Sequence, residues 1–220
     1  MPRVLPPSKK RRMKKTFTLL LVAVSLVAFA ASGTAQSSHG TNFASNGTGK
    51  VTMATVGPGQ TYTAPDGTVV TNNGNRPNDP VVNVKTYHDR KGEPISTDVN
   101  PRPGADFSVS GLDSCRDRVN IPNGRGTTAE LTGHDYTTYI RGSDGNVTIN
   151  GDNTHTNGTR MGSGNTINQN GNNGVGNMGG HGNTVNVTGD SNRWGNLDNN
   201  SSSSSGSSNT FTSDEQDTSC

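Results

Sequence analysis

The chain has 220 residues, a formal net charge of +2 and an apolar fraction of only 26%. Seven of the 19 basic residues and none of the 17 acidic residues precede residue 36, so the chain beyond residue 35 has a net charge of −5. Nucleic-acid binding needs a basic patch on the folded domain, and this balance argues against one. The scarcity of apolar residues argues against an ordinary globular core and predicts extensive disorder.

Residues 1–35 have the order of a secretory signal peptide. A basic cluster, "KKRRMKK", precedes the apolar run "TFTLLLVAVSLVAFA" and a stretch of small residues. The run is about fifteen residues long, shorter than the roughly 20 that span a bilayer. We expect translation from Met1 or Met13 and cleavage after Ala30 or, preferably, Ala35. The product would be secreted or on the cell surface (periplasmic in a Gram-negative host) without a stable membrane anchor; an uncleaved anchor is the alternative.

The residues between the predicted signal peptide and the repeats are expected to form short, irregular strands. The turn signals "GPG" and "PDG" divide the first β-favouring residues, and the alternation in "VVNVKTY" indicates a further strand. Three prolines mark the next segment as a linker, and the segment after it has the highest apolar density beyond the signal. We therefore expect a flexible leader at 36–50, short strands or a hairpin at 51–88, a linker at 89–106 and a cap for the repeats at 107–141.

Residues 142–198 contain a repeat of 18 or 19 residues. Gly-Asn pairs begin at Gly145, Gly164 and Gly182, and a second glycine follows at offsets of six, seven and seven. The rare branched residues recur in phase between the glycines, which is typical of a solenoid. Val and Ile would point inward, Gly and Asn would turn the corners, and stacked Asn side chains would form ladders. The expected core consists of Val147, Ile149, Ile167, Val185 and Val187.

The predicted fold class is mostly β with extensive disorder, with a short parallel β-solenoid in the C-terminal half and irregular short strands before it. Burial of five core side chains contributes roughly 7–15 kcal/mol. Ordering the segment costs several times as much, at about 1–2 kcal/mol for each backbone unit. The repeats therefore need either residues 107–141 as a cap or stacking on copies of themselves, and a disordered monomer is the alternative.

Parts of the repeat resemble known repeat families. "SGNTINQNGNN" resembles a curlin repeat in Ser163, Gln169 and Gly171, with the next Asn displaced to Asn173. "GGHGNTVNV" resembles the calcium-binding nonapeptide repeat, but Thr184 stands where that family has an Asp, so no calcium site is expected. The whole region is similar to Asn/Gly-rich β-solenoid repeats of bacterial secreted surface and matrix proteins, and this resemblance implies a structural role outside the cell.

Residues that could carry chemistry are few. No hydrolase, metal or phosphate motif occurs, so we expect no catalytic, cofactor-binding or metal-binding residues. Cys115 and Cys220 can form one disulfide in an oxidising compartment, or Cys220 can stay free or pair between chains. A Cys–His hydrolase using Cys115 and His134 is a further alternative. Trp194 is the candidate for ligand contact, with packing at a strand end as its alternative. The Ser-rich tail at 199–220 is expected to be disordered.

These features predict a secreted, non-catalytic surface or extracellular-matrix protein that acts in structure or adhesion through its β repeats. Self-association or a surface polymer is the expected partner, and nucleic acid is not. A secreted carbohydrate-binding module is the first alternative, with the flat face of the solenoid against a polysaccharide or an ice-like lattice. A small secreted enzyme or inhibitor built on residues 51–141 is the second.

Overall fold

The computed structural model describes residues 36–38, 49–197 and 199–218. The chain divides into two units, Met1–Ala31 and Ser32–Cys220, and all described residues belong to the second. The predicted signal peptide at 1–35 and residues 39–48 of the predicted leader lie outside the described residues. Within the described part, no helix is long and apolar enough to cross a bilayer.

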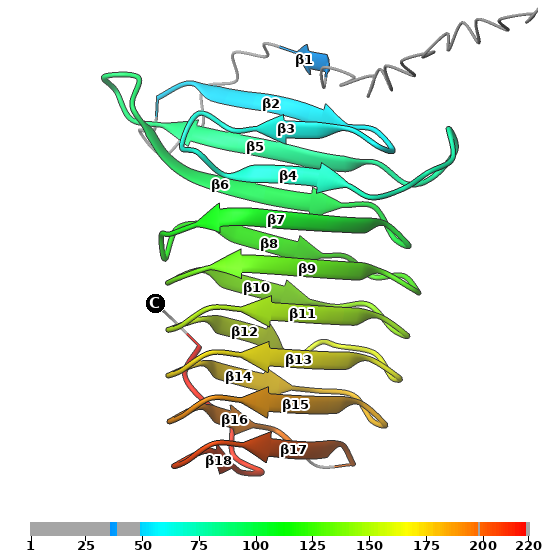
Figure 1. Cartoon of the computed structure of the whole chain (residues 1–220), viewed down its shortest axis with the longest axis vertical. Helices are drawn as coiled ribbons and strands as arrows, with labels where there is room; N and C mark the ends of the chain where they lie inside the picture. The colour runs from blue at the N-terminus through cyan, green and yellow to red at the C-terminus, as the bar shows by residue number, and fades with distance from the viewer. Residues whose placement is uncertain (1–35, 39–48, 198, 219–220) are drawn as a thin grey trace, which may run out of the picture. The chain divides into compact units, whose positions relative to one another are not determined.

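Two β-sheets contain all the strands of the described residues, and the strands of sheet A lie in front of those of sheet B in Figure 1. Sheet A has the order β17-β15-β13-β11-β9-β7-β4-β3, and sheet B has the order β1-β2-β5-β6-β8-β10-β12-β14-β16-β18. The strands of sheet A are β3 (Thr61–Thr63), β4 (Val69–Asn72), β7 (Asp106–Leu112), β9 (Thr128–Gly133), β11 (Asn146–Asn150), β13 (Thr166–Asn170), β15 (Thr184–Thr188) and β17 (Ser201–Ser205). The strands of sheet B are β1 (Gln36–Ser38), β2 (Val51–Val56), β5 (Val82–His88), β6 (Pro94–Pro101), β8 (Arg118–Ile121), β10 (Thr137–Ile140), β12 (His155–Gly158), β14 (Val175–Met178), β16 (Arg193–Gly195) and β18 (Thr210–Phe211).

Strand pairing changes from antiparallel to parallel along the stack. β2, β5 and β6 pair antiparallel in sheet B, and β3, β4 and β7 do so in sheet A. From β6 and β7 onward every pair is parallel. Each turn then places one strand in sheet A and the next in sheet B, from β7–β8 to β17–β18. The predicted parallel β-solenoid in the C-terminal half is confirmed, and it has about six turns.

The solenoid begins earlier in the sequence than predicted. Residues 107–141, expected to form a cap, contain β7 to β10 and so build the first two turns, whereas the antiparallel strands at 51–101 lie at that end of the stack. These first turns share the register of the later ones: Val109, Leu131 and Ile149 lie side by side on the inner face. They lack the Asn/Gly-rich composition of the later turns, so the sequence did not mark them as repeats.

Strand β6 runs through the predicted linker at 89–106. Its register pairs it with β5 over its whole length. Pro94 and Pro101 are the first and last residues of the strand, where a missing backbone N–H disturbs the ladder least. The predicted leader also contains a strand, since β1 pairs antiparallel with β2 and begins directly after Ala35.

The Ser-rich tail forms strands β17 and β18 within its described residues, 199–218, so the prediction of a disordered tail was wrong. β17 pairs with β15 and β18 pairs with β16, because the preceding turn offers a ready row of backbone donors and acceptors. Ser203 Oγ donates a hydrogen bond to Asn186 Oδ1 at 2.7 Å, and Ser207 N–H donates to Asp190 Oδ1 at 2.6 Å. All five residues of β17 are exposed, which gives the stack a polar last turn, as solenoids require at their ends.

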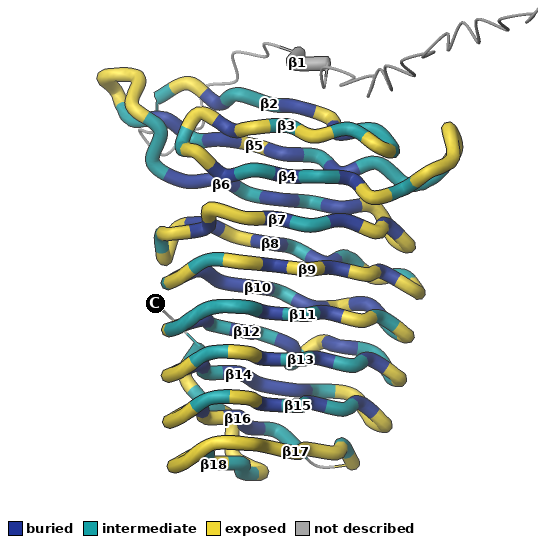
Figure 2. The backbone as a smooth tube through the Cα atoms, in the orientation of Figure 1, coloured by how far each residue is buried: buried dark blue, intermediate teal, exposed yellow. Residues whose placement is uncertain are grey.

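A narrow apolar core lies between the two sheets. Figure 2 shows the alternation of buried and exposed residues along the middle strands, and the exposure of β17 at the end. Where sheet B contributes a glycine, a larger neighbour fills the space: a Cβ at Gly176 would lie 2.6 Å from the indole ring of Trp194, its partner in the register. The five residues of the expected repeat core are all buried, with exposures of at most 2%: Val147, Ile149, Ile167, Val185 and Val187.

One corner of the solenoid is built from stacked glycines. A Cβ on any of four glycines would collide with the carbonyl oxygen of the glycine one turn earlier, so the turns can approach only without side chains at this position. Two residues after each of them, the chain adopts the left-handed conformation with φ between 54° and 60°, which Asn and Ser tolerate. The glycines are Gly151, Gly171, Gly189 and Gly206, and the left-handed residues are Asn153, Asn173, Ser191 and Ser208.

Two ladders of asparagines tie successive turns together. In the first ladder, Asn183 Oδ1 accepts the backbone N–H of Asn165 at 2.8 Å, and Asn200 Oδ1 accepts that of Asn183 at 2.9 Å. In the second ladder, at the other corner, Asn209 Oδ1 accepts the backbone N–H of Asn192 at 2.9 Å. Asn165, Asn183 and Asn192 are at most 2% exposed, so these amides satisfy backbone groups that water does not reach.

The first repeat unit is displaced by one residue from the predicted register. β11 and β13 pair with an offset of 20 residues, so Gly145 aligns with Asn165 and not with Gly164. Asp144, with a φ of 53°, takes the left-handed position that Gly164 fills one turn later. An Asp can adopt this conformation, and the glycine therefore appears one position late in the sequence.

Candidate functional site

The outer face of sheet A carries a regular array of uncharged polar side chains. Residues in β11, β13, β15 and β17 alternate between the inner and the outer face, so three outward residues of each strand stand in register with those of the next. Only Asn, Thr and Ser occupy these positions, which we call the hydroxyl–amide face. Its residues are Asn146, Thr148, Asn150, Thr166, Asn168, Asn170, Thr184, Asn186, Thr188, Ser201, Ser203 and Ser205.

Hydrogen bonds between neighbouring strands orient the asparagine side chains of this face. Asn186 Nδ2 donates to Asn168 Oδ1 at 3.0 Å, and Asn168 Nδ2 donates to Asn146 Oδ1 at 3.3 Å. In the next column, Asn170 Nδ2 donates to Asn150 Oδ1 at 2.8 Å. Neighbouring strands lie roughly 4.8 Å apart and alternate residues about 6.7 Å apart, so the face is a regular lattice of polar groups. Such an ordered face loses little side-chain entropy on binding.

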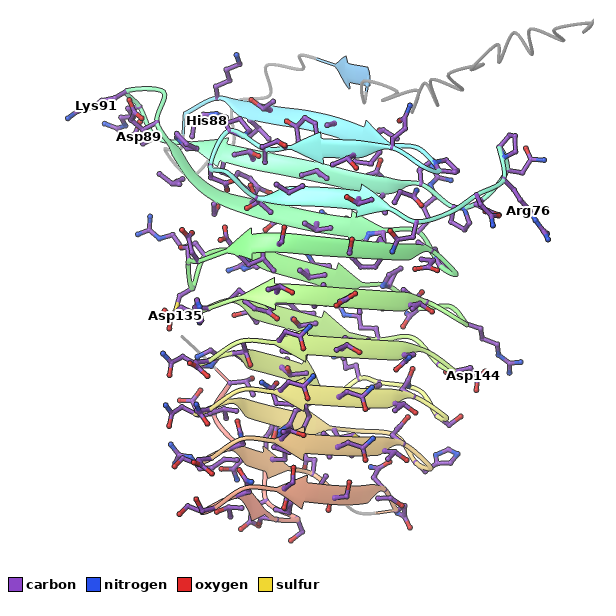
Figure 3. All side chains as sticks on the ribbon, viewed as in Figure 1. Arg76, His88, Asp89, Lys91, Asp135 and Asp144 are labelled. Atoms are coloured by element: carbon purple, nitrogen blue, oxygen red, sulfur yellow. The ribbon has the colours of Figure 1, made fainter. Side chains whose placement is uncertain are left out.

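Charged side chains lie away from this face. On the outer side of sheet A, carboxylates occur at Asp106 and Glu130, in the two turns that precede the array. Elsewhere charges stand on loops, on corners and within strands of sheet B. At one corner, Arg125 Nε lies 3.5 Å from a carboxylate oxygen of Asp144. Figure 3 labels five charged side chains on loops or corners at the edges of the sheets: Arg76, Asp89, Lys91, Asp135 and Asp144.

The outer face of sheet B is partly covered by the end of the chain. After β18, residues 212–218, which we call the C-terminal strap, turn back along the stack (Figure 1). Asn177 accepts the backbone N–H of Gln216 at 2.7 Å and donates its Nδ2 to the carbonyl oxygen of Gln216 at 2.5 Å. Asn177 has no exposed surface. The two sheets therefore present different surfaces, an open face on sheet A and a strapped face on sheet B.

Burial shifts the pKa of several groups associated with sheet B, including Asp117, Asp98 and His155. It raises the pKa of Asp117, although hydrogen bonds from the backbone N–H groups of Thr97 (2.8 Å) and Asp113 (3.2 Å) act in the opposite direction. It also raises the pKa of Asp98 and lowers the pKa of His155. The contacts of Asp117 join β6 to the connection between β7 and β8, so this carboxylate supports the start of the solenoid.

Trp194 does not lie where the sequence analysis expected a ligand contact. Its side chain has no exposed surface, and its ring packs against Gly176 between the two sheets. A buried ring offers no platform to a ligand at the surface, so the predicted ligand contact was wrong and the packing alternative describes this residue.

Cys115 is disulfide-bonded. Cys220, the other cysteine of the chain, lies outside the described residues, so the pairing of these two residues stays a prediction. A disulfide sulfur is not a thiolate, and the hydrolase alternative on Cys115 and His134 therefore lacks its nucleophile in this structure.

Among the described residues, no group of three or more His, Cys, Asp or Glu side chains could hold a metal ion. Comparison of the chain with protein-family models, with curated proteins and with solved structures found no match. The resemblance of the repeats to bacterial surface and matrix solenoids therefore stays a prediction.

A groove on the outer face of sheet B was not predicted from the sequence. Tyr139, Arg141, Asn157 and Arg160 line it, from β10, β12 and the residues that follow these strands. The alternation in "TTYI" could have placed Tyr139 outward, because Ile140 is apolar and faces the core. The partnership with Asn157 could not have been found in this way, since it depends on the pairing of β10 with β12.

Proposed function

We propose that this protein is exported and acts outside the cell as a non-catalytic structural or adhesion protein, which attaches to a neutral polysaccharide surface through its hydroxyl–amide face. The observation that carries the proposal is the array of Asn, Thr and Ser on four successive strands of sheet A. No charged or aromatic side chain interrupts it.

The chemistry of the face favours a neutral, hydroxylated and ordered partner. Amide and hydroxyl groups both donate and accept hydrogen bonds, as sugar hydroxyls do. A charged polymer would gain no ion pair here, and an apolar surface would bury polar groups without partners. Each hydrogen bond contributes little on its own, about 0.5–1.5 kcal/mol. Attachment therefore depends on many contacts at once, which a repeating polymer surface supplies better than a single soluble sugar.

Export is supported by the N-terminal sequence and by the redox state of Cys115. The basic and apolar segments before residue 36 have the order of a secretory signal. Cleavage after Ala35 would leave β1, which begins at Gln36, intact. A disulfide at Cys115 fits an oxidising compartment.

The proposal is tested by sedimenting the protein with microcrystalline cellulose and with chitin particles. The variant T166K/T184K places two charged, longer side chains on the two central strands of the face. Thr55 and Thr210 are exposed on the outer side of sheet B, so T55K/T210K adds the same two charges elsewhere. We expect the wild type and T55K/T210K to sediment with at least one of the particles, and the affinity of T166K/T184K to fall by about tenfold or more. Equal binding by the two variants, or no binding by the wild type, would contradict the proposal.

Self-association is a second candidate, favoured by the edge of sheet A. β17 is the last strand of this sheet and pairs with β15 alone among the described residues. An open strand edge can pair with a strand of another molecule. Sedimentation velocity over a range of concentrations tests this candidate: assembly at the edge predicts a concentration-dependent increase in mass, and a constant monomer mass would exclude it.

A further inference from the structure

Two adjoining pockets form one groove on the outer face of sheet B. The first, of about 290 Å³, lies beside the corner that follows β12, and the second, of about 490 Å³, lies against the C-terminal strap. Both are lined by Tyr139 and Asn157, so the two are continuous at these residues. We call this hollow the Tyr139 groove.

The strand register leaves the aromatic ring of Tyr139 open on the sheet. Thr138 and Ile140 face the core, so Tyr139 faces outward, and it is half-buried. Its partners in the neighbouring strands are Asn120 and Asn157. Both have shorter side chains than tyrosine, so the ring stands above its neighbours. A tyrosine combines a flat apolar face with a polar hydroxyl, which suits a ligand that is partly apolar and partly hydroxylated.

One end of the groove is cationic. Arg141 and Arg160 both line the first pocket and both are exposed. Neither forms an ion pair within the described residues. Two unpaired guanidinium groups in one small pocket favour a carboxylate or another anion, which each can bind through two parallel hydrogen bonds. This charge is unusual in a chain whose net charge beyond residue 35 is −5.

The other side of the groove offers partners for hydroxyl groups. The strap contributes Glu215, Gln216, Asp217 and Thr218 to the second pocket, so this side holds two carboxylates beside an amide and a hydroxyl, all of which can bind sugar hydroxyls. Asn157 Oδ1 accepts the hydroxyl of Thr159 at 2.9 Å, which orients the amide and leaves its Nδ2 group as a donor. A ligand that fills the whole groove therefore needs a negative charge at one end and hydroxyl groups at the other.

We propose that the Tyr139 groove binds an acidic sugar unit of a polysaccharide, with the sugar carboxylate on Arg141 and Arg160 and the sugar ring against Tyr139. A uronic acid combines the carboxylate, the flat ring face and the hydroxyl groups in one unit. This site is on sheet B, so it does not depend on the function proposed for sheet A. The protein would have one face for a neutral polymer and one groove for an acidic polymer.

Calorimetric titration with trigalacturonate tests the site on the full chain. The variant R141Q/R160Q removes both charges from the groove, and R76Q/R193Q removes two exposed charges from elsewhere. We expect R141Q/R160Q to weaken binding by about tenfold or more and R76Q/R193Q to leave it within about twofold. Y139A is expected to weaken binding as well, whereas Y139F, which keeps the ring, is expected to retain most of it. Circular dichroism confirms that each variant is folded.

Four results would overturn the assignment. They are no binding of trigalacturonate by the wild type, an equal loss in R76Q/R193Q, equal binding of neutral maltotriose, and competition by sulfate that is as strong as competition by galacturonate. The second result would mean that net charge alone attracts the sugar, and the last would mean that the groove recognises an anion and not a sugar. The cellulose and chitin measurements are separate, so either proposal can fail without the other.

Discussion

At the scale of single residues, space between successive turns decides which glycines the fold needs. Gly171 and Gly182 both have positive φ, 144° and 66°. A Cβ at Gly171 would collide with the carbonyl oxygen of Gly151, whereas a Cβ at Gly182 would meet nothing within 4 Å. The first glycine is required by the close approach of two turns, and the second by its backbone angle alone.

This difference predicts unequal effects of the same substitution. G182A is expected to lower the free energy of unfolding by about 1–2 kcal/mol, the cost of a left-handed alanine. G171A must also push two turns apart, and we expect a loss larger by a further 2 kcal/mol or so. Urea unfolding followed by circular dichroism measures both, and equal losses would show that the turns at Gly171 are not in contact.

At the scale of elements, buried and exposed asparagines have different functions. Asn192 Oδ1 accepts the backbone N–H of Gly174 at 2.7 Å, and its Nδ2 donates to the carbonyl oxygen of Gly171 at 2.9 Å. Both backbone groups lie at a corner, where neither forms a hydrogen bond with a neighbouring strand. Asn186 also bridges turns, but it does so on the outer face, where water can replace its hydrogen bonds. The buried amide of Asn192 stabilises the corner, whereas the exposed amide of Asn186 orders the surface side chains.

Removing one amide from each ladder tests this distinction. N192A leaves a buried donor and a part-buried acceptor without partners, and we expect the free energy of unfolding to fall by about 2–4 kcal/mol. N186A is expected to cost about 1 kcal/mol or less, because the groups it frees are hydrated. Thermal and urea unfolding of the two variants give the comparison. A similar cost for both would mean that water reaches the inner corner.

At the scale of the whole molecule, the strap binds the end of the chain to an earlier part, and the predicted disulfide would do the same. Each turn of a solenoid contacts only its neighbours, so the last turn is the one most easily lost. The strap crosses from the last turn to Asn177 in β14, two turns of sheet B earlier. A bond from the end of the chain to Cys115, just before β8, would extend this connection to the first turn of the solenoid.

The predicted pairing of Cys115 with Cys220 therefore has a large expected effect. It would close a loop of about 100 residues, for which the entropic contribution to stability is about 4–5 kcal/mol. C115S, C220S and the double variant should lose the same free energy of unfolding, since each removes the same bond. Peptide mapping without reduction identifies the pair directly. A covalent dimer, or a larger loss in the double variant than in either single one, would contradict the pairing.

How much the sequence could predict depends on how far apart the interacting residues are. The class of fold and the repeat core followed from local pattern, because a branched residue at alternate positions must face inward wherever a strand forms. The early turns, β6 and the Ser-rich last turn were missed because Phe107, Pro94 and the serines of β17 carry no repeat signature of their own. These segments become ordered by pairing with the exposed strand edge of a neighbouring strand or turn.

The sequence by itself determined the strand character, the corners and the inward residues of the solenoid, because these depend on the backbone angles of Gly and Asn and on side-chain alternation over a few positions. Only the tertiary structure decided which side chains share a surface. Stacking in register assembles the hydroxyl–amide face from four strands, and it places Tyr139 beside Asn157. The same stacking buries Trp194 under Gly176, since a residue's exposure depends on what the neighbouring turn supplies at its position.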